Sequence, residues 1–350
     1  MNELPPLLHG PAVWRGPDMA ARRDWVETFR AEDIAEIEAA IRPLAQADIA
    51  ADIANIRAAD FPLPTLGPRL ARIRHDVLHG RGFVLLRGLP VQRWSRRESA
   101  TAFFGLGTYF GHAVSQNAKG HVLGHVQDLG LHADDPNVRI YQTHERQTFH
   151  TDSADIVGLM CLHTAKAGGD SALVSSNTLW NELRERAPEL AARLLEPIAT
   201  DRRGEVPAGE KPYFTIPVFN WFDGHMSAIY QRQYIASAQR FADAPRLTPA
   251  HLAALDLFDQ LANDPTLHFL MTLEPGDMQL VHNHTLLHDR TAFTDWPEPT
   301  RKRHLLRLWL APPDARALPP VFAQRYGSVQ PGARGGVPAG VPLNAPLQAV

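Results

Sequence analysis

The sequence of 350 residues has little cysteine and no long apolar run. Its single cysteine, Cys161, excludes an intramolecular disulfide. Because Cys161 lies in the apolar run 156–162, we expect a buried and unreactive thiol. No apolar run approaches the roughly 20 residues that a membrane-spanning helix needs. The first residues also lack the basic and apolar regions of a signal peptide, so we expect a cytoplasmic protein.

The chain also lacks a strong charge of either sign. Its 35 Lys and Arg residues face 38 Asp and Glu residues, which gives a formal net charge of -3. A nucleic-acid or anionic-membrane binder needs a basic excess, so neither is expected as a partner. Hydrophobic residues make up 44% and charged residues 21%, as in ordinary globular proteins. We therefore expect a small-molecule partner and leave a homo-oligomer open.

Apolar periodicity predicts helices first and strands later. Ile34, Ile37 and Ile41 recur at helical spacing, and the run from Leu66 to Val77 does the same. Ser95 to Glu98 forms a capping-box pattern, and Thr178 and Thr248 are predicted to cap two later helices. Short apolar runs between Gly and Pro turns predict strands at 82–86, 156–162, 171–176, 213–219, 226–230, 268–273, 278–282 and 303–310.

Many short strands with few long helices predict a β-sandwich or barrel with helices packed outside. We expect one catalytic domain over 1–350. It would consist of a helical N-terminal buttress (1–80), the β core with helical insertions (81–325) and an extended tail (326–350) that is either loose or laid over the surface. No repeat and no break in composition calls for a second domain.

Histidine is abundant, with 17 residues, and one His-x-Asp triplet stands in a favourable context. Chance alone gives about two His-x-acid triplets in such a composition, and the chain has two, at His132–Asp134 and His150–Asp152. The first lies in a turn-like stretch. The second precedes the apolar strand 156–162, and residues two apart on an extended chain point to the same face. His150 and Asp152 could therefore bind one metal ion together.

A third ligand would complete a site of two histidines and one carboxylate, which suits Fe(II) with open positions for a cosubstrate and O₂. His282, His284 and His288 are the candidates. Their spacing alone does not choose among them, and each of them could equally be a surface histidine at the end of a strand.

The predicted strand 303–310 places Arg303, Leu305, Arg307 and Trp309 on one face and an almost wholly apolar set on the other. On a surface strand the arginine face would be solvated. Inside a barrel, two buried guanidinium groups would need an anion, because a buried and unpaired charge is very costly. An interior position therefore predicts a bound carboxylate.

Four motifs in order resemble the taurine dioxygenase/clavaminate synthase-like (TauD/TfdA) branch of Fe(II)/2-oxoglutarate-dependent oxygenases. They are His150-Thr151-Asp152, Gly168-Gly169-Asp170-Ser171, Asn283 with His288, and Arg303 with Arg307. The resemblance covers roughly residues 80–325. It implies a mainly β fold with flanking helices, whose core is a double-stranded β-helix (jelly roll, cupin-like). It also implies that His150, Asp152 and His288 bind the iron.

The resemblance further assigns Arg303, Ser171 and Asn283 to the 2-oxoglutarate site, and Arg307 to that site or to the substrate side. Residues 296–299 lengthen the segment before the arginine strand, which leaves Arg301 as an alternative to Arg303, although the strand phase favours Arg303. The implied reaction uses O₂ and 2-oxoglutarate to hydroxylate, desaturate or cleave a small anionic molecule, with release of succinate and CO₂. Related halogenases replace the carboxylate ligand by a small residue, so the carboxylate of Asp152 argues against halogenation.

Two other interpretations stay open. A Zn- or Mn-dependent lyase or isomerase on a cupin-type barrel could use the same ligands without 2-oxoglutarate, and a non-catalytic binding barrel would need no carboxylate ligand. Tyr230, Arg232 and Tyr234 could line the substrate pocket or lie on an ordinary surface strand. The polar loop 117–125 is a candidate lid.

Overall fold

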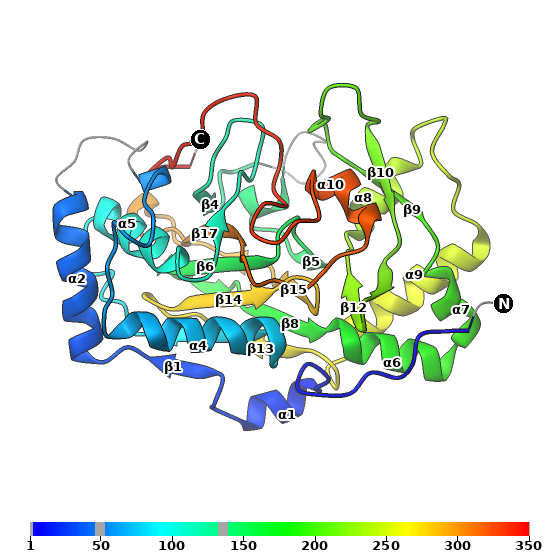
Figure 1. Ribbon diagram of the computed structural model, residues 1–350, viewed down its shortest axis with the longest axis horizontal. Helices are drawn as coiled ribbons and strands as arrows, with labels where there is room; N and C mark the ends of the chain where they lie inside the picture. Colours follow the sequence, from blue (N-terminus) through cyan, green and yellow to red (C-terminus); the bar gives the residue numbers. More distant parts are fainter. Residues whose placement is uncertain (1–2, 46–52, 132–138, 350) are drawn as a thin grey trace.

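A computed structural model (Figure 1) describes residues 3–45, 53–131 and 139–349. The predicted turn with His132 and Asp134 lies outside these ranges. None of the helices within them has the length and apolar character of a membrane span.

Two sheets form the core of the molecule. The larger sheet has the strand order β1 (Val26–Thr28), β2 (Phe83–Arg87), β14 (Met278–His282), β6 (Ile156–His163), β17 (His304–Ala311) and β3 (His112–Ala113), and β4 (Gly124–Val126) also pairs with β17. The smaller sheet has the order β13 (Phe269–Met271), β8 (Ser171–Ser175), β15 (Leu286–Arg290) and β5 (Gln147–His150). Apolar side chains of both sheets, among them Phe83, Leu305 and Leu173, meet in one buried cluster. This is the expected jelly-roll core.

Helices cover the outer faces of both sheets (Figure 1). On the larger sheet, α2 (Ala31–Ala45), α4 (Leu66–His79) and α5 (Arg96–Gly107) share an apolar cluster with Leu280, Leu306 and Leu308. On the smaller sheet, α6 (Ser176–Arg186), α7 (Pro188–Arg193) and α9 (Pro249–Ala262) pack with Val174 and Leu287. The short helix α1 (Gly16–Ala21) contacts β13. The apolar residues that recur at helical spacing in the sequence therefore form the buried faces of these helices.

Two of the three predicted helix caps are confirmed, and one is wrong. The Ser95–Glu98 capping box opens α5, and Thr248 caps α9. Thr178 is not a cap: its backbone N–H donates to the hydroxyl of Ser175, which is the true N-cap of α6. The helix therefore starts three residues earlier than expected. The helix ends at Arg186, and α7 starts at Pro188, which has no N–H group for continued helical bonding.

A group of short strands and helices, called the wall below, lies beside the two core sheets, mostly at the right of Figure 1. It contains β9 (Ile198–Asp201), β10 (Tyr213–Ile216), β11 (Phe219–Phe222), β12 (His225–Ala228), α8 (Arg232–Ala238) and α10 (Ala323–Tyr326). The sequence predicted β10 and β12 but not β9 or α8. The remaining short elements are β7 (Ala167–Gly168), β16 (Phe293–Thr294), and the 3₁₀ turns η1 (Ile140–Gln142), η2 (Pro299–Arg301) and η3 (Pro320–Phe322).

The C-terminal segment after α10 lies across the molecule. The backbone N–H of Asn344 donates to Gly120 and its carbonyl accepts from Val122, while the N–H of Val337 donates to the carbonyl of Ser115. Ala345 is fully buried. The composition allowed this segment to be either loose or laid over the surface, and in the structure it is laid over the surface.

Candidate active site

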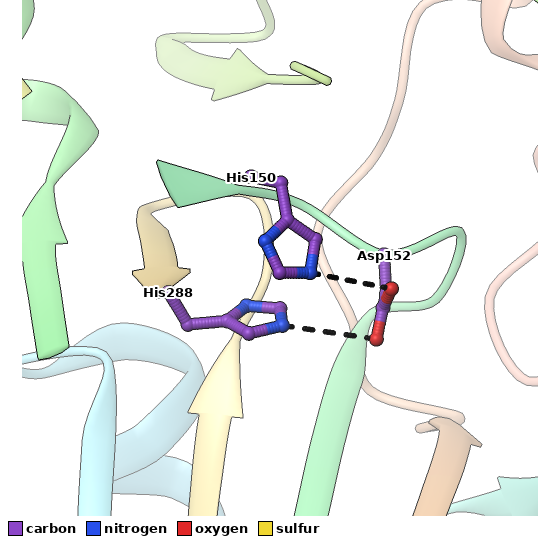
Figure 2. Close-up of side chains that lie close together, drawn as sticks. All are labelled: His150, Asp152 and His288. Atoms are coloured by element: carbon purple, nitrogen blue, oxygen red, sulfur yellow. Dashed lines mark ion pairs between the residues drawn. The ribbon is translucent and has the colours of Figure 1, made fainter. Parts of the chain in front are cut away.

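Three of the predicted ligands converge at one edge of the smaller sheet (Figure 2). His150 ends β5 and lies opposite His288 of β15 in the antiparallel register. Asp152 follows in the loop after β5. Their ligand atoms all lie within 4.8 Å of one another, and this is the one such cluster of His, Cys, Asp and Glu in the described ranges. Each imidazole Nε2 is 3.8 Å from a different oxygen of Asp152, too far for a hydrogen bond.

The surroundings hold both imidazoles in the neutral form that binds metals. The Nδ1–H of His150 donates to the carbonyl of Thr148 at 2.8 Å, which leaves the Nε2 lone pair toward Asp152. In the structure the amide of Gln147 contacts this Nε2 at 2.8 Å. Burial lowers the pKa of His150, and burial together with His150 lowers the pKa of His288 to about 3.

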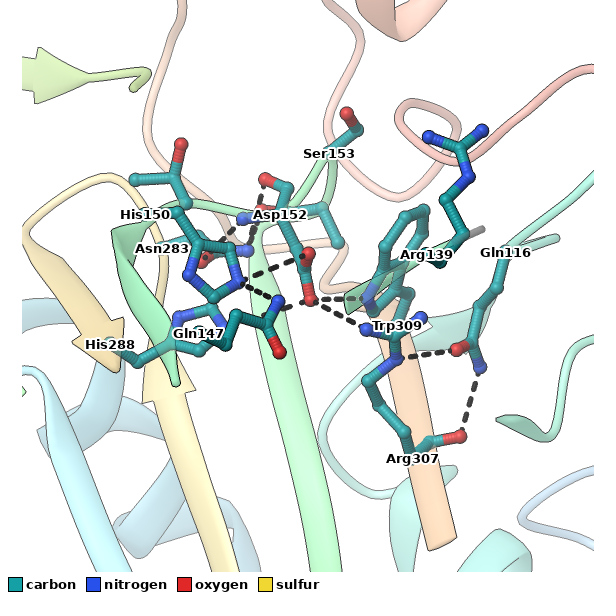
Figure 3. Close-up of polar contacts among 12 residues, drawn as sticks. Gln116, Arg139, Gln147, His150, Asp152, Ser153, Asn283, His288, Arg307 and Trp309 are labelled. Carbon is teal, nitrogen blue, oxygen red and sulfur yellow. Dashed lines mark hydrogen bonds and ion pairs between the residues drawn. The ribbon is translucent and has the colours of Figure 1, made fainter. Parts of the chain in front are cut away.

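Asp152 is held as a carboxylate by the residues of β17 (Figure 3). Burial alone would raise its pKa, but Arg307 and the two imidazoles keep that pKa below its ordinary value. The indole N–H of Trp309 donates to Oδ2 at 2.8 Å, and Arg307 Nη1 lies 3.4 Å from the same oxygen. Gln116 fixes Arg307 in turn: its amide oxygen accepts from Nε at 2.8 Å.

This arrangement fits a divalent iron ion. Two neutral imidazoles and one carboxylate are the donor set of a facial triad. The Nε2 atoms of both imidazoles face the carboxylate of Asp152, so the three ligands direct their binding atoms toward one point.

The other two candidate histidines are engaged elsewhere. His284 Nε2 lies 2.9 Å from Asp155 Oδ1, and His282 Nδ1 lies 2.9 Å from the hydroxyl of Thr285. Both imidazoles are buried. Among the three alternatives that the spacing left open, His288 is the one that the structure brings to His150 and Asp152.

An inner cavity of about 40 Å³ adjoins His150 and His288. Its walls include the predicted cosubstrate residues Ser171, Arg303 and Arg307. Arg303 is 5% exposed, and burial lowers its pKa to about 10. Its Nη2 donates to the carbonyl of Gly169 at 3.3 Å, whereas Nη1 has no partner. Within the described residues no acidic side chain forms an ion pair with this guanidinium, so the cavity is built to receive an anion.

The two faces of β17 match the prediction from its alternation. Leu305 and Arg307 line the inner cavity together with Arg303, while Leu306 and Leu308 pack toward the helices. A solvated arginine face is therefore wrong. Arg301 is different: its side chain is 52% exposed and stacks on Trp296.

Sequence reasoning missed Arg290, which also lines the inner cavity. It stands two residues after His288 on the same strand. Because alternate residues of a strand face the same side, its position could have indicated that it faces the cavity together with His288. Its guanidinium donates to the backbone carbonyls of Thr143 and Glu145. Burial lowers its pKa to about 9. Arg290 therefore ties the segment before β5 to the cavity wall.

Asn283 lies outside the inner cavity's lining residues. Its amide donates to the carbonyls of Asp152 and Ala154 at 3.1 and 3.0 Å, and it accepts from the backbone N–H of Asp152 (Figure 3). In this structure it holds the loop that carries Asp152. A direct contact of Asn283 with a cosubstrate stays a prediction.

An outer cavity of about 100 Å³ also borders the triad and shares Tyr141, Gln147, His150 and Arg307 with the inner cavity. Its lining runs from His150, Asp152 and Trp309 to the wall of β9, β10, α8 and α10. Tyr230 and Tyr234 line it, as the pocket interpretation predicted. Arg232 instead pairs with Asp256 and Asp259 at 2.6 and 3.1 Å.

The predicted lid loop 117–125 borders a third, smaller cavity, to which Asn117 and His121 contribute. Its action as a lid stays a prediction.

Comparison with known proteins matches most of the chain to one family. The pattern of the family described as "Taurine catabolism dioxygenase TauD, TfdA family" matches residues 40–309. FR-33289 synthase from Streptomyces rubellomurinus is 34% identical over 261 residues, which cover 74% of this chain and 77% of that protein. The taurine hydroxylase-like protein SAT17 from Stachybotrys chartarum is 30% identical over 324 residues, 87% and 82% of the two chains.

The fold is similar to that of a solved oxygenase. An asparagine oxygenase in complex with Fe(II), hydroxyasparagine and succinate superposes with a TM-score of 0.64. It is 18% identical, and the match covers 82% of this chain and 93% of that one.

Proposed function

Because this chain belongs to the TauD/TfdA family of dioxygenases, we propose that His150, Asp152 and His288 hold its iron and that Arg303, Arg307 and Ser171 hold 2-oxoglutarate. The protein is an Fe(II)- and 2-oxoglutarate-dependent oxygenase that uses O₂. It couples the oxidative decarboxylation of 2-oxoglutarate, which releases succinate and CO₂, to hydroxylation of a small molecule.

One observation supports the residue assignment above all: two of the proposed metal ligands, His150 and His288, line the same cavity as buried Arg303, whose Nη1 has no partner. 2-Oxoglutarate carries a carboxylate at each end and a keto group beside one of them. The distal carboxylate can neutralise Arg303 and accept from Nη1, with the hydroxyl of Ser171 as a second donor. The other end then lies toward His150 and His288.

The protein groups set the geometry and exclude water. Thr148 fixes the tautomer of His150, and Trp309 and Arg307 orient the carboxylate of Asp152. Val157, Leu159 and Leu305 form the apolar wall of the inner cavity. Bound iron supplies the activation of O₂, which no side chain of the protein can perform.

The outer cavity is proposed as the place of the primary substrate, since it borders His150 and Asp152 and adjoins the inner cavity. The substrate would be a small, anionic organic molecule. The expected cytoplasmic location and a homo-oligomer stay predictions from the sequence.

Anaerobic binding of 2-oxoglutarate to the Fe(II)-loaded protein tests the assignment, because the chelate gives a weak visible charge-transfer band. Arg303→Ala removes a charge-assisted pair in a desolvated site. This should cost about 2–5 kcal/mol, or roughly 30-fold to several-thousand-fold in affinity. Arg301→Ala is the matched control. It removes an exposed arginine two residues away and should leave the affinity within a few-fold of the wild type.

Equal, near-wild-type affinities in both variants would exclude Arg303 as the cosubstrate arginine. A loss in Arg301→Ala alone would transfer the assignment to Arg301. Absence of the band in the wild-type protein would favour the lyase or binding-protein interpretation.

A further inference from the structure

Gln116 holds both the side chain and the backbone of Arg307 (Figure 3). Within the described residues the guanidinium of Arg307 has two hydrogen-bond acceptors: Gln116 Oε1 lies 2.8 Å from Nε, and Asp152 Oδ2 lies 3.4 Å from Nη1. The amide of Gln116 also donates to the backbone carbonyl of Arg307 at 2.9 Å. The shorter of the two side-chain contacts is therefore the one with Gln116.

The amide of Gln116 is itself fixed in one place. It is 6% exposed and makes a second donation, to the carbonyl of Val122 at 3.0 Å. Gly124, which pairs with Arg307 in the register of β4 and β17, leaves the space for it: a Cβ atom at this position would collide with Oε1 of Gln116. The φ of Gly124 is not in the left-handed region, so this glycine is needed here for space.

The C-terminal strap, residues 337–346, lies against the loop that carries Gln116 (red in Figure 1). Three backbone hydrogen bonds of 2.8–2.9 Å join the two segments: Val337 N–H to Ser115 O, Asn344 N–H to Gly120 O, and Val122 N–H to Asn344 O. The fully buried Ala345 belongs to the apolar cluster under the helices. The strap lies beyond residues 40–309, which the family pattern matches.

A directional chain of side-chain hydrogen bonds anchors the end of the strap. His125 Nε2 donates to the carbonyl of Pro346 at 2.8 Å, which leaves Nδ1 of the neutral imidazole as an acceptor. His304 Nε2 lies 2.8 Å from this Nδ1, and Arg96 Nη1 lies 3.0 Å from His304 Nδ1. Because His125 directly follows Gly124 in β4, the strap is bound to the same short strand that makes room for the amide.

We propose that Gln116 is a positioning residue for Arg307 in the oxygenase reaction, and that the C-terminal strap keeps Gln116 in place. The inference rests on the proposed function, since that function assigns Arg307 to the cosubstrate site. An arginine side chain has several rotatable bonds, so holding it in one conformation costs side-chain entropy. Gln116 orders Arg307 before 2-oxoglutarate binds, and less affinity is then lost on binding.

Gly124→Ala tests the positioning role without changing Gln116 or Arg307. The added methyl group displaces the amide, so 2-oxoglutarate should bind the Fe(II)-loaded protein at least about fivefold more weakly, as should Gln116→Ala, measured by the anaerobic charge-transfer band. Gly158→Ala is the matched control. It adds the same group to β6, which also pairs with β17, but meets no atom closer than 3.4 Å and should leave the affinity unchanged.

The affinity for Fe(II), measured on the same variants, distinguishes positioning from a general distortion. Trp309 still donates to Asp152 in Gln116→Ala, so binding of Fe(II) should weaken less than binding of 2-oxoglutarate. A distorted fold would weaken both alike, which would contradict the positioning role.

Double variants separate action through Arg307 from direct contact with the cosubstrate. In an Arg307→Ala background, Gln116→Ala should cause no further loss of 2-oxoglutarate affinity, and Gly124→Ala should cause none in a Gln116→Ala background. A further loss in the Arg307→Ala background would show that Gln116 contacts the cosubstrate itself, and would overturn the inference.

Removal of residues 338–350 tests the strap, and His125→Phe tests it in the whole chain, where only the bond to Pro346 and the contact with His304 are lost. Both changes should weaken 2-oxoglutarate binding and add little in a Gln116→Ala background. His125→Phe gives an answer even where the truncated protein fails to fold. A strap that only stabilises the fold would lower Tm and leave the affinity of the folded protein unchanged, which would refute its role.

Unchanged 2-oxoglutarate affinity in both Gln116→Ala and Gly124→Ala would overturn the inference as a whole. The wild-type charge-transfer band separates this failure from that of the proposed function. A normal wild-type band with unchanged affinity in the variants refutes only the positioning role. Absence of the band in the wild type refutes the assignment of iron and 2-oxoglutarate, and the inference with it.

Discussion

Two buried histidine–aspartate clusters lie side by side in this molecule, and only one of them is open. In the triad, Asp152 lies 3.8 Å from the imidazole of His288. Three residues further along the chain, Asp155 lies 2.9 Å from the imidazole of His284. The second cluster is closed by Arg334, whose Nη2 lies 2.6 Å from Asp155 and whose Nε contacts both carboxylate oxygens.

The difference lies in what completes each cluster. Arg334 comes from the C-terminal segment, is 2% exposed and supplies the positive charge that Asp155 needs in a buried place. In the triad, Arg307 and Trp309 contact only Oδ2 of Asp152, and the Nε2 atoms of His150 and His288 both lie 3.8 Å from the carboxylate, too far for a hydrogen bond. A metal site is therefore recognised by side-chain ligand atoms that converge on one point without hydrogen-bonding one another. Nearly the same residue types form a structural cluster when they pair with one another and with an arginine, as His284 and Asp155 do with Arg334.

The largest expected effect separates the two histidines. His288→Ala should abolish iron-dependent succinate formation, a loss of more than about 100-fold, because removal of a ligand exceeds the effect of removing an outer-shell partner. His284→Ala, normalised to folded protein by circular dichroism, should keep Fe(II) binding and the charge-transfer band. Retained activity in His288→Ala with loss in His284→Ala would reverse the comparison and identify His284 as the ligand.

The next effect concerns the closed cluster. Arg334→Met leaves Asp155 as a buried charge without its cation and should lower the free energy of unfolding by about 3–5 kcal/mol, measured by urea denaturation. Metal affinity of the folded fraction should change little. Adding Asp155→Asn to Arg334→Met removes the unpaired charge and should recover part of the stability. A loss below about 1 kcal/mol in Arg334→Met would mean that the pair behaves as a solvated one.

The smallest effect is a pH dependence. His284 is packed against Asp155, Arg334, Arg316 and His282, and burial lowers its pKa despite the hydrogen bond to Asp155. The unfolded chain therefore takes up a proton as the pH falls through about 6.5, whereas the folded chain does not.

Stability should accordingly be constant above neutral pH and fall below about pH 6.5, by at most about 1.4 kcal/mol per pH unit for this one proton. The pKa of Asp155 is lowered as well, so its contribution is lost only at a lower pH, near and below about 4. Urea denaturation of His284→Gln between pH 7 and 5.5 should show a shallower slope than the wild type. An identical slope would show that His284 titrates alike in both states.

Local patterns in the sequence determined the strand faces and most of the helix starts of this protein. Alternation with a period of two identified the faces of β17, because a strand places every second side chain on the same side whatever lies around it. The same rule pointed to His150 and Asp152, although Asp152 lies in the loop just after β5, and the capping signals at Ser95 and Thr248 marked true helix starts. These features depend on neighbours within a few residues, which the sequence lists directly.

Only the tertiary structure decided the rest. The choice of His288 over His284 depends on the register that places His288 opposite His150, while His284 meets Asp155, whose cation Arg334 is 50 positions away along the chain. The joint position of Arg139 and Arg325 beside Glu205 likewise joins three separate parts of the chain. The physical reason is that a buried charge must find its partner in space, and the identity of that partner is a property of packing that no local spacing contains.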